Sequence, residues 1–166
     1  AVHQLPVIFM VQNNQYAISV PSAKQMAVPS AADKACGLGL RGLSVDGSNV
    51  LEVYKIMSEA VERARSGGGP TLIEARVNRI TPHSSDDDDR SYRSREEVEE
   101  GKRNDAILIS RQVLEKEGVL NAKLVEEMEV KAKEMVDAAV AAAEAAPYPD
   151  VSEAAYPVYV EEVRRG

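Results

Sequence analysis

The chain has 166 residues, of which 44% are hydrophobic and 28% are charged, and this length and composition are typical of one soluble globular domain. Its net charge of −7 argues against a general nucleic-acid binder, which needs a basic surface, and weakly against docking on anionic lipid. We expect neither a transmembrane segment nor a signal peptide, because no apolar run could span a bilayer and the start of the sequence has no basic region.

The first predicted element is a strand over residues 5–11, a short and nearly continuous apolar run. Such a run predicts a strand that is buried on both faces of a parallel sheet. Polar residues follow at once, beginning with Gln12, Asn13 and Asn14. Because ligands of open α/β sheets bind just beyond the carboxyl ends of the strands, this Asn pair lies where a site is expected. An ordinary Asn-rich turn is the alternative when the pair is considered alone.

Strands and helices alternate in the next part of the chain. The predicted elements are a helix over residues 30–35, a strand over 40–45, a helix over 50–65 and a strand over 71–77. Ser30 can cap the first helix, and Ser48 or Asn49 can cap the second, whose apolar residues recur every three or four positions. This order predicts the α/β class with a mostly parallel sheet, flanking helices and a right-handed crossover.

A long polar loop over residues 78–93 follows, and such loops in compact domains are usually functional or mobile. Its acidic run lacks the ligand spacing of an EF-hand, which favours a solvated loop. The remaining predicted elements are helices over residues 96–103, 106–117 and 121–145, and a short strand around 156–160. The last helix has one apolar stripe, for which packing on its own domain is a simpler interpretation than a coiled coil or a docking face.

Asn13, Asn14 and Tyr16 offer the kind of ligands that a magnesium ion uses. Mg²⁺ prefers oxygen ligands in near-octahedral geometry. Asn side-chain oxygens and backbone carbonyls at a sharp turn supply such ligands without excess negative charge. This set therefore suits a metal that is already bound to a diphosphate.

Several segments, in the same order, resemble those of the alpha subunits of thiamine diphosphate-dependent 2-oxoacid dehydrogenases. They are QNNQYAIS (12–19), LSVDGSNV (43–50), GGPTLIEA (68–75), RITPHSSDD (79–87) and SYRSREEV (91–98). The resemblance implies the thiamine diphosphate-binding, Rossmann-like fold. Residues 1–100 would be the C-terminal part of that domain, including the active-site loop, and residues 101–166 would be its helical extension.

The resemblance also implies roles for single residues. Asn14, through its side chain, and Tyr16, through its carbonyl, would bind Mg²⁺, and Ile18 would lie beside a ring of the cofactor. His83 would face the active-site channel near the cofactor's reactive carbon and help in the reductive acylation of the lipoyl group. This role suits a side chain that exchanges protons near neutral pH, while a solvent-exposed loop histidine is the alternative for His83 considered alone.

The same resemblance gives the loop over residues 78–93 an ordering network of ion pairs and hydrogen bonds. The residues implied are Arg79, Ser84, Asp86, Tyr92 and Arg93. In eukaryotic relatives, serines at the positions of Ser84 and of Ser91 or its neighbours are phosphorylated. A phosphate there would add charge and bulk beside His83.

The implied activity is the oxidative decarboxylation of a 2-oxoacid with transfer of the acyl group to lipoyl. The implied partners are a beta subunit, in an assembly of two alpha and two beta subunits, and a lipoyl-bearing acyltransferase, with no nucleic acid and no membrane. The cytoplasm is the expected location, or the mitochondrial matrix for a eukaryotic chain. The YAIS and HSSDD segments favour a branched-chain substrate, and pyruvate or acetoin dehydrogenase remains an alternative.

The sequence departs from the family's pattern at its start. The family's fingerprint opens with GDG well before the Asn pair, whereas only twelve residues precede Asn13 here. We therefore expect an incomplete Mg²⁺ site and a chain that is inactive alone. Position 15, often Gly in the family, is Gln15. An inert fragment that serves only folding and assembly, or an unrelated binding domain, is the remaining alternative.

Overall fold

The computed structural model describes residues 1–155, which fall into two compact units. Unit 1 is Ala1–Val119, and unit 2 begins at Leu120. The short strand predicted around residues 156–160 lies outside the described residues.

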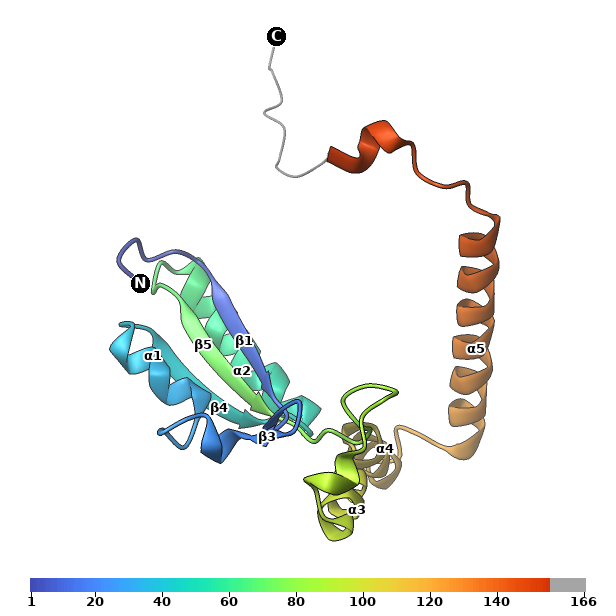
Figure 1. Cartoon of the computed structure of the whole chain (residues 1–166), viewed down its shortest axis with the longest axis horizontal. Helices are drawn as coiled ribbons and strands as arrows, with labels where there is room; N and C mark the ends of the chain where they lie inside the picture. The colour runs from blue at the N-terminus through green and yellow to red at the C-terminus, as the bar shows by residue number, and fades with distance from the viewer. Residues whose placement is uncertain (156–166) are drawn as a thin grey trace. The chain divides into compact units, whose positions relative to one another are not determined.

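Unit 1 is built on a three-stranded parallel sheet (Figure 1). The strands, in spatial order, are β1 (Ile8–Asn13), β5 (Thr71–Arg76) and β4 (Arg41–Asp46). Asn13 and Asp46 both pair with Arg76, so the three strands end at the same edge of the sheet. A short antiparallel pair follows that edge, formed by β2 (Tyr16–Ala17) and β3 (Val20–Pro21). The predicted α/β class with a parallel sheet is confirmed.

One face of the sheet packs against α2 (Val50–Arg65), which runs along the strands in Figure 1. The buried side chains at this interface are Val45, Ala60, Ile73 and Ala75. The Asn49 side chain accepts hydrogen bonds from the Leu51 and Glu52 backbone N–H groups and so begins the helix. Both the bounds of this helix and Asn49 as one of its two candidate caps were predicted from the sequence, because they depend on local signals.

The opposite face of the sheet is covered by a short segment made of η2 (Ala31–Asp33) and α1 (Lys34–Gly37). Ser30 caps this segment through its side chain, as predicted. The segment lies very close to β4: a Cβ atom added to Gly42 would be only 2.3 Å from the Ala32 carbonyl oxygen. This face is therefore closed by a near approach of backbone to backbone.

The prediction for the first strand was wrong in two respects. The strand begins at Ile8 and continues to Asn13, whereas residues 5–11 were predicted. Pro6 has no backbone N–H to contribute to a ladder, which explains the late start. The strand is also not buried on both faces, because Phe9 is 49% exposed and Met10 is 38% exposed. Within residues 1–155, β1 pairs with β5 alone, so it lies at an edge of the sheet.

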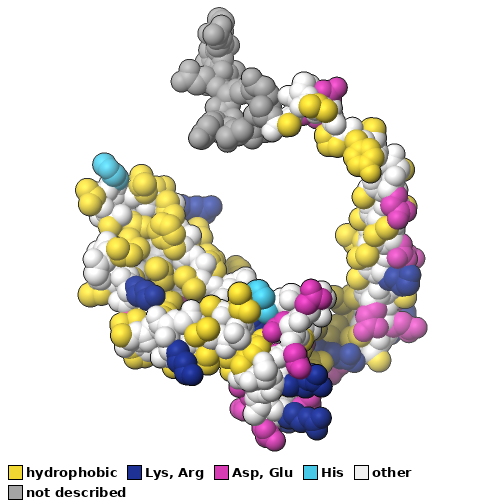
Figure 2. Space-filling model, in the orientation of Figure 1, with side chains coloured by type: hydrophobic (Ala, Val, Ile, Leu, Met, Phe, Trp, Pro, Cys, Tyr) yellow, Lys and Arg dark blue, Asp and Glu magenta, His cyan; other side chains and the backbone are white. Residues whose placement is uncertain are grey.

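Four further helical segments belong to unit 1, one directly after β3 and three after β5. They are η1 (Ser22–Lys24), η3 (Asp89–Ser91), α3 (Arg95–Arg103) and α4 (Ala106–Lys116). Ser94 and Asp105 cap α3 and α4 through their side chains. In Figure 2, hydrophobic side chains spread over the sheet part of unit 1, whereas charged side chains are concentrated around α3.

Unit 2 contains the long helix α5 (Ala122–Ala145), capped by Asn121, and η4 (Val151–Ala155). Large apolar side chains of α5 are exposed, among them Met128 and Met135, each 64% exposed. The interpretation that this stripe packs on its own domain stays a prediction. No helix within residues 1–155 is long and apolar enough to cross a membrane.

Candidate functional site

The turn after β1 is built by two asparagine side chains in succession. Asn13 Oδ1 accepts a hydrogen bond from the Gln15 backbone N–H at 2.9 Å. Asn14 Oδ1 accepts one from the Tyr16 backbone N–H at 3.1 Å. Asn favours such turns because its side-chain oxygen reaches the amide two residues further on. The chain therefore bends sharply at the carboxyl edge of the parallel sheet, where ligands of such sheets bind.

Gln15, within this turn, and Ile18, shortly after it, have left-handed backbone conformations. The φ angle is 70° at Gln15 and 55° at Ile18. For a β-branched residue such a value is costly, and it persists where the surrounding structure imposes it, often at a functional site. Ile18 is 57% exposed, and its carbonyl oxygen accepts a hydrogen bond from Arg79 Nη1 at 2.7 Å. The segment thus holds an apolar side chain toward solvent in a fixed backbone conformation.

Sequence reasoning missed a buried acid beside the turn, Glu74. Its side chain is completely buried within unit 1. Its carboxylate accepts hydrogen bonds from the side chains of Asn13, Ser30 and Ser44 and from the Ala31 backbone N–H. Burial raises the pKa of Glu74, but these hydrogen bonds outweigh burial and lower the pKa to about 2. An acidic residue in the middle of a predicted buried strand was the signal that could have found it.

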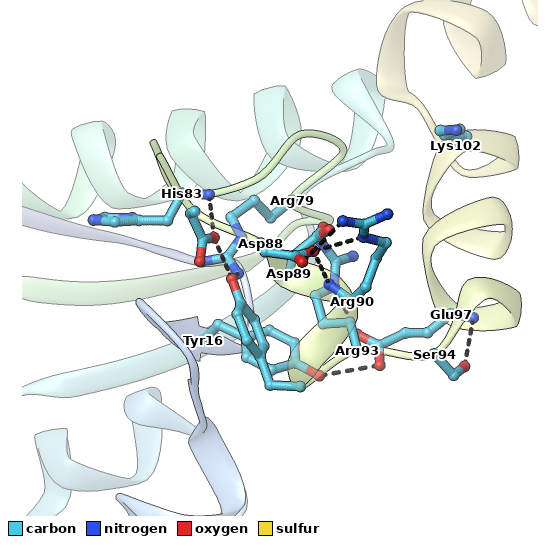
Figure 3. Close-up of polar contacts among 12 residues, drawn as sticks. Tyr16, Arg79, His83, Asp88, Asp89, Arg90, Arg93, Ser94, Glu97 and Lys102 are labelled. Carbon is cyan, nitrogen blue, oxygen red and sulfur yellow. Dashed lines mark hydrogen bonds and ion pairs between the residues drawn. The ribbon is translucent and has the colours of Figure 1, made fainter. Parts of the chain in front are cut away.

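Tyr16 extends from the turn into a cluster of aromatic and cationic side chains (Figure 3). The rings of Tyr16 and Tyr92 are 5.8 Å apart between centroids. The Arg79 guanidinium carbon lies 5.2 Å from the centroid of Tyr16 and 5.6 Å from that of Tyr92. The Arg93 guanidinium carbon lies 5.5 Å from the centroid of Tyr16. Cation–π contacts of this kind attract each guanidinium to the ring faces.

Carboxylates surround this cluster and balance its charge. The Tyr16 hydroxyl donates to Glu97 Oε2 at 3.0 Å, while Arg93 Nε contacts Glu97 Oε1 at 3.2 Å. The Arg93 side chain is 3% exposed, and its Nη1 also contacts Asp89 Oδ2 at 3.4 Å. Burial raises the pKa of Tyr16, and the hydrogen bond to Glu97 raises it further. The phenol therefore stays protonated at neutral pH and remains a hydrogen-bond donor.

Asp87 joins the part of the loop that contains His83 to the cluster. The Tyr92 hydroxyl and the His83 backbone N–H both donate to Asp87 Oδ2, the second at 2.9 Å. Arg79 Nη2 donates to the Tyr92 hydroxyl at 2.7 Å. The hydrogen bond from Tyr92 is the main cause of a lowered pKa at Asp87. The imidazole of His83 is exposed and extends away from Arg79 and Tyr16 (Figure 3).

The structure thus brings together most, though not all, of the residues predicted to order the loop. Arg79, Tyr92 and Arg93 lie in the cluster, whereas Ser84 and Asp86 are exposed. The carboxylates that hold the loop are Asp87, Asp89 and Glu97, which sequence reasoning did not single out. The run of four aspartates, residues 86–89, contains no signal that tells which of them face inward.

Similarity along most of the chain decides between membership of the family that the segments resemble and an unrelated domain. The chain matches the family model "Dehydrogenase E1 component" over residues 1–152. The chain belongs to the dehydrogenase E1 component family. The resemblance found from the sequence segments is therefore confirmed.

Curated relatives of this E1 chain are alpha subunits. It is 52% identical over 148 residues to the 2-oxoisovalerate dehydrogenase subunit alpha of Bacillus subtilis. The matched region is 89% of this chain and 45% of that protein. It is 45% identical over 161 residues to the 3-methyl-2-oxobutanoate dehydrogenase subunit alpha of Mycobacterium tuberculosis, a match that covers 97% of this chain and 44% of that protein. It is 40% identical over 141 residues to the pyruvate dehydrogenase E1 component subunit alpha of Staphylococcus aureus, a match that covers 84% of this chain and 38% of that protein. The chain spans less than half the length of these relatives.

The residues of this E1 chain fit part of a site for a metal and a cofactor. Within residues 1–155, no group of three or more His, Cys, Asp or Glu side chains could hold a metal ion. The oxygens that the turn itself offers, from Asn side-chain amides and backbone carbonyls, are neutral, which suits Mg²⁺ whose charge is balanced by phosphates. The cavity beside Asn13 and Tyr16 has a volume of about 160 Å³. Pockets for cofactors are roughly 300–1,000 Å³, so this cavity is too small to enclose a cofactor by itself.

Proposed function

We propose that this chain is part of the alpha subunit of a branched-chain 2-oxoacid dehydrogenase, with a thiamine diphosphate-binding, Rossmann-like fold. The parent enzyme would decarboxylate the 2-oxoacid oxidatively and pass the acyl group to lipoyl. Family membership supports the reaction class, and higher identity to the 2-oxoisovalerate and 3-methyl-2-oxobutanoate enzymes than to the pyruvate enzyme, 52% and 45% against 40%, supports the substrate class. Pyruvate and acetoin are the alternative substrates.

The observation that carries the proposal is the turn at the carboxyl end of β1. In it, Asn14 would bind Mg²⁺ through Oδ1 and Tyr16 through its carbonyl oxygen. Asn14 Oδ1 already accepts one hydrogen bond at 3.1 Å, and an amide oxygen has a second lone pair for a cation. Ile18 would pack against a ring of the cofactor, since it is an exposed apolar side chain in a left-handed conformation.

Thiamine diphosphate, when bound, supplies the carbanion chemistry of decarboxylation. The chain's own contribution is to position and to move protons. His83 is exposed on a loop that is anchored through Asp87 and Tyr92, so its imidazole can reach a substrate while its backbone is held. Imidazole accepts and donates protons near neutral pH, which suits the acyl-transfer step. Arg79 and Arg93 keep the loop in place, and Ser84 and Asp86 are its exposed members beside His83.

The proposed partners follow from the same assignment. A beta subunit would complete the site in an assembly of two alpha and two beta subunits, and a lipoyl-bearing acyltransferase would accept the acyl group. The relatives are named as alpha subunits, which supports a partner subunit. We place the parent enzyme in the cytoplasm of a bacterium, in line with the bacterial sources of the relatives.

The test uses the complete alpha subunit assembled with its beta subunit. Decarboxylation of a branched-chain 2-oxoacid and of pyruvate, and carbon–carbon cleavage of acetoin, which has no carboxyl group, are measured with thiamine diphosphate and Mg²⁺, and the branched-chain acid is expected to have the highest kcat/KM. A folded assembly that decarboxylates no 2-oxoacid would refute the enzyme assignment. A higher kcat/KM for pyruvate would refute the branched-chain assignment alone.

Asn14→Ala tests the turn in the same assembly. Loss of one metal ligand should weaken Mg²⁺-dependent cofactor binding on the order of tenfold or more. Asn104→Ala is the matched control, because Asn104 is exposed at the end of α3. If Asn14→Ala and Asn104→Ala both bind the cofactor as the unaltered enzyme does, Asn14 is not part of the site.

A further inference from the structure

Glu74 lies in the middle of β5, on the face of the sheet opposite α2. Its side chain is 0% exposed. Glu74 Oε1 accepts from Asn13 Nδ2 at 2.7 Å and from the Ala31 backbone N–H at 2.9 Å. Glu74 Oε2 accepts from the hydroxyls of Ser30 and Ser44, the second at 2.9 Å. One carboxylate therefore joins the end of β1, the cap of the η2 segment and strand β4.

The bond between Glu74 and Asn13 fixes which way the Asn13 amide faces. Because Nδ2 points to Glu74, Oδ1 points to the Gln15 backbone N–H at 2.9 Å and to the Ser22 hydroxyl at 3.4 Å. A flipped amide would place its NH₂ group against the Gln15 N–H, with two donors facing each other. Glu74 thus determines the first of the two side-chain bonds that shape the turn.

We propose that Glu74 is a positioning residue that holds the Asn13–Asn14 turn in the geometry that presents Asn14 Oδ1 and the Tyr16 carbonyl to a divalent cation. This inference rests on the proposed function, in which those two groups bind Mg²⁺. Residues behind metal ligands orient them, and changing such residues typically costs metal affinity by about 10–100-fold. Glu74 acts through Asn13 and touches neither the cation nor the cofactor.

The donors around Glu74 show which substitutions keep the acceptor for Asn13 and which remove it. Comparing the two kinds tests whether Glu74 positions the turn or only stabilises the fold. On the Oε1 side, the Asn13 amide NH₂ and the Ala31 N–H can only donate. On the Oε2 side, the hydroxyls of Ser30 and Ser44 can either donate or accept. A glutamine can therefore keep its oxygen toward Asn13 and turn its NH₂ toward the hydroxyls, whereas a methionine leaves Asn13 without an acceptor.

The experiment uses the complete alpha subunit in its assembled enzyme. The apparent dissociation constant for Mg²⁺ is measured at a fixed thiamine diphosphate concentration, and hydrogen exchange of residues 12–19 is measured without cofactor. Glu74→Met should raise the constant about tenfold or more and speed the exchange, while Glu74→Gln should change both much less. Ser44→Ala is the control, because it removes a donor to Glu74 on β4 and leaves the Asn13 bond in place.

The inference is overturned if Glu74→Met lowers the melting temperature as Ser44→Ala does but leaves the Mg²⁺ constant and the exchange of residues 12–19 unchanged. If Glu74→Met does not assemble, Asn13→Ala breaks the same bond from the other side and should give the same loss. Normal Mg²⁺ affinity in Asn13→Ala, alongside weak affinity in Asn14→Ala, would also overturn it. Normal affinity in Asn14→Ala refutes the metal role of the turn, while hydrogen exchange still reports whether Glu74 holds it.

Discussion

The two faces of the small sheet are buried by different means, although neighbouring residues of one strand supply both. Ile73 is 1% exposed and packs with Val45, Ala60 and Ala75 under α2. Glu74, the next residue, is 0% exposed and is surrounded by hydrogen-bond donors from the turn, the η2 segment and β4. The apolar face is held by non-directional burial, whereas on the polar face directional bonds around Glu74 are added to the close packing of Ala32 and Ala35.

This difference has a consequence for the site. Apolar burial has no preferred direction, whereas a hydrogen bond weakens steeply when its angle departs far from linearity. A buried group left without its partner costs roughly 1–3 kcal/mol, which is more than a made bond contributes. The polar face therefore holds the end of β1 in one arrangement, and that end is where Asn13 and Asn14 form the turn.

The strongest way to break the polar face is Gly42→Val in the complete subunit. A Cβ atom at Gly42 would lie 2.3 Å from the Ala32 carbonyl oxygen and 2.9 Å from the Ala35 side chain. The η2–α1 segment would have to leave the sheet, and the expected loss of unfolding free energy exceeds about 4 kcal/mol. Gly37→Ala is the control, since an added Cβ there meets no atom within 4 Å. An unchanged denaturation midpoint for Gly42→Val would show that the close approach is not required.

Ile73→Ala tests the apolar face with the next largest effect. Removing a buried isoleucine leaves a cavity under α2, and the expected cost is roughly 2–5 kcal/mol by urea denaturation. Mg²⁺-dependent cofactor binding should change little at temperatures where the variant remains folded, because this face does not contact the turn. A selective loss of Mg²⁺ affinity without loss of stability would contradict the assignment of separate tasks to the two faces.

The acid dependence of stability distinguishes the two faces further. The pKa of Glu74 is about 2 in the folded chain against an ordinary 4.5, so its stabilising effect is complete above pH 4.5 and is lost as the pH falls toward 2. The advantage of the unaltered subunit over Glu74→Gln should therefore be constant near neutral pH and shrink over that acid range. Urea midpoints at a series of pH values measure it, with Glu62→Gln, at an exposed position of α2, as control. Parallel curves for both variants would contradict this account.

The smallest expected effect concerns the turn that the polar face supports. Gln15 has a φ angle of 70°, in the region where glycine is free of steric cost. Gln15→Gly should stabilise the subunit by up to about 1 kcal/mol, because relief of strain slightly exceeds the added entropy of the unfolded chain. Gln15→Ala keeps the strain and serves as the comparison in thermal unfolding. A glycine variant less stable than the alanine variant would show that the side chain, rather than the strain, decides stability here.

Local sequence signals predicted much of the framework. The bounds of α2 follow from its apolar periodicity and from the Asn49 cap, all of which lie within the helix or next to it. The start of β1 was predicted too early, and its burial was overestimated, because a strand's burial depends on the neighbours it acquires in the sheet. The Asn13–Asn14 turn was expected from the residues themselves, and an exposed loop histidine was the alternative for His83 considered alone. The metal-binding and catalytic roles come from the resemblance and remain proposals.

By itself, the sequence determined the α/β class and the family, and it placed the proposed site at the end of the first strand. The tertiary structure alone decided which polar residues meet there. Glu74 and Asn13 are separated by 61 positions, and Tyr16 and Glu97 by 81, so no local pattern could pair them. A hydrogen bond depends on the distance and angle between two groups, and these become defined only when β1 meets β5 and β2 meets α3 in the fold.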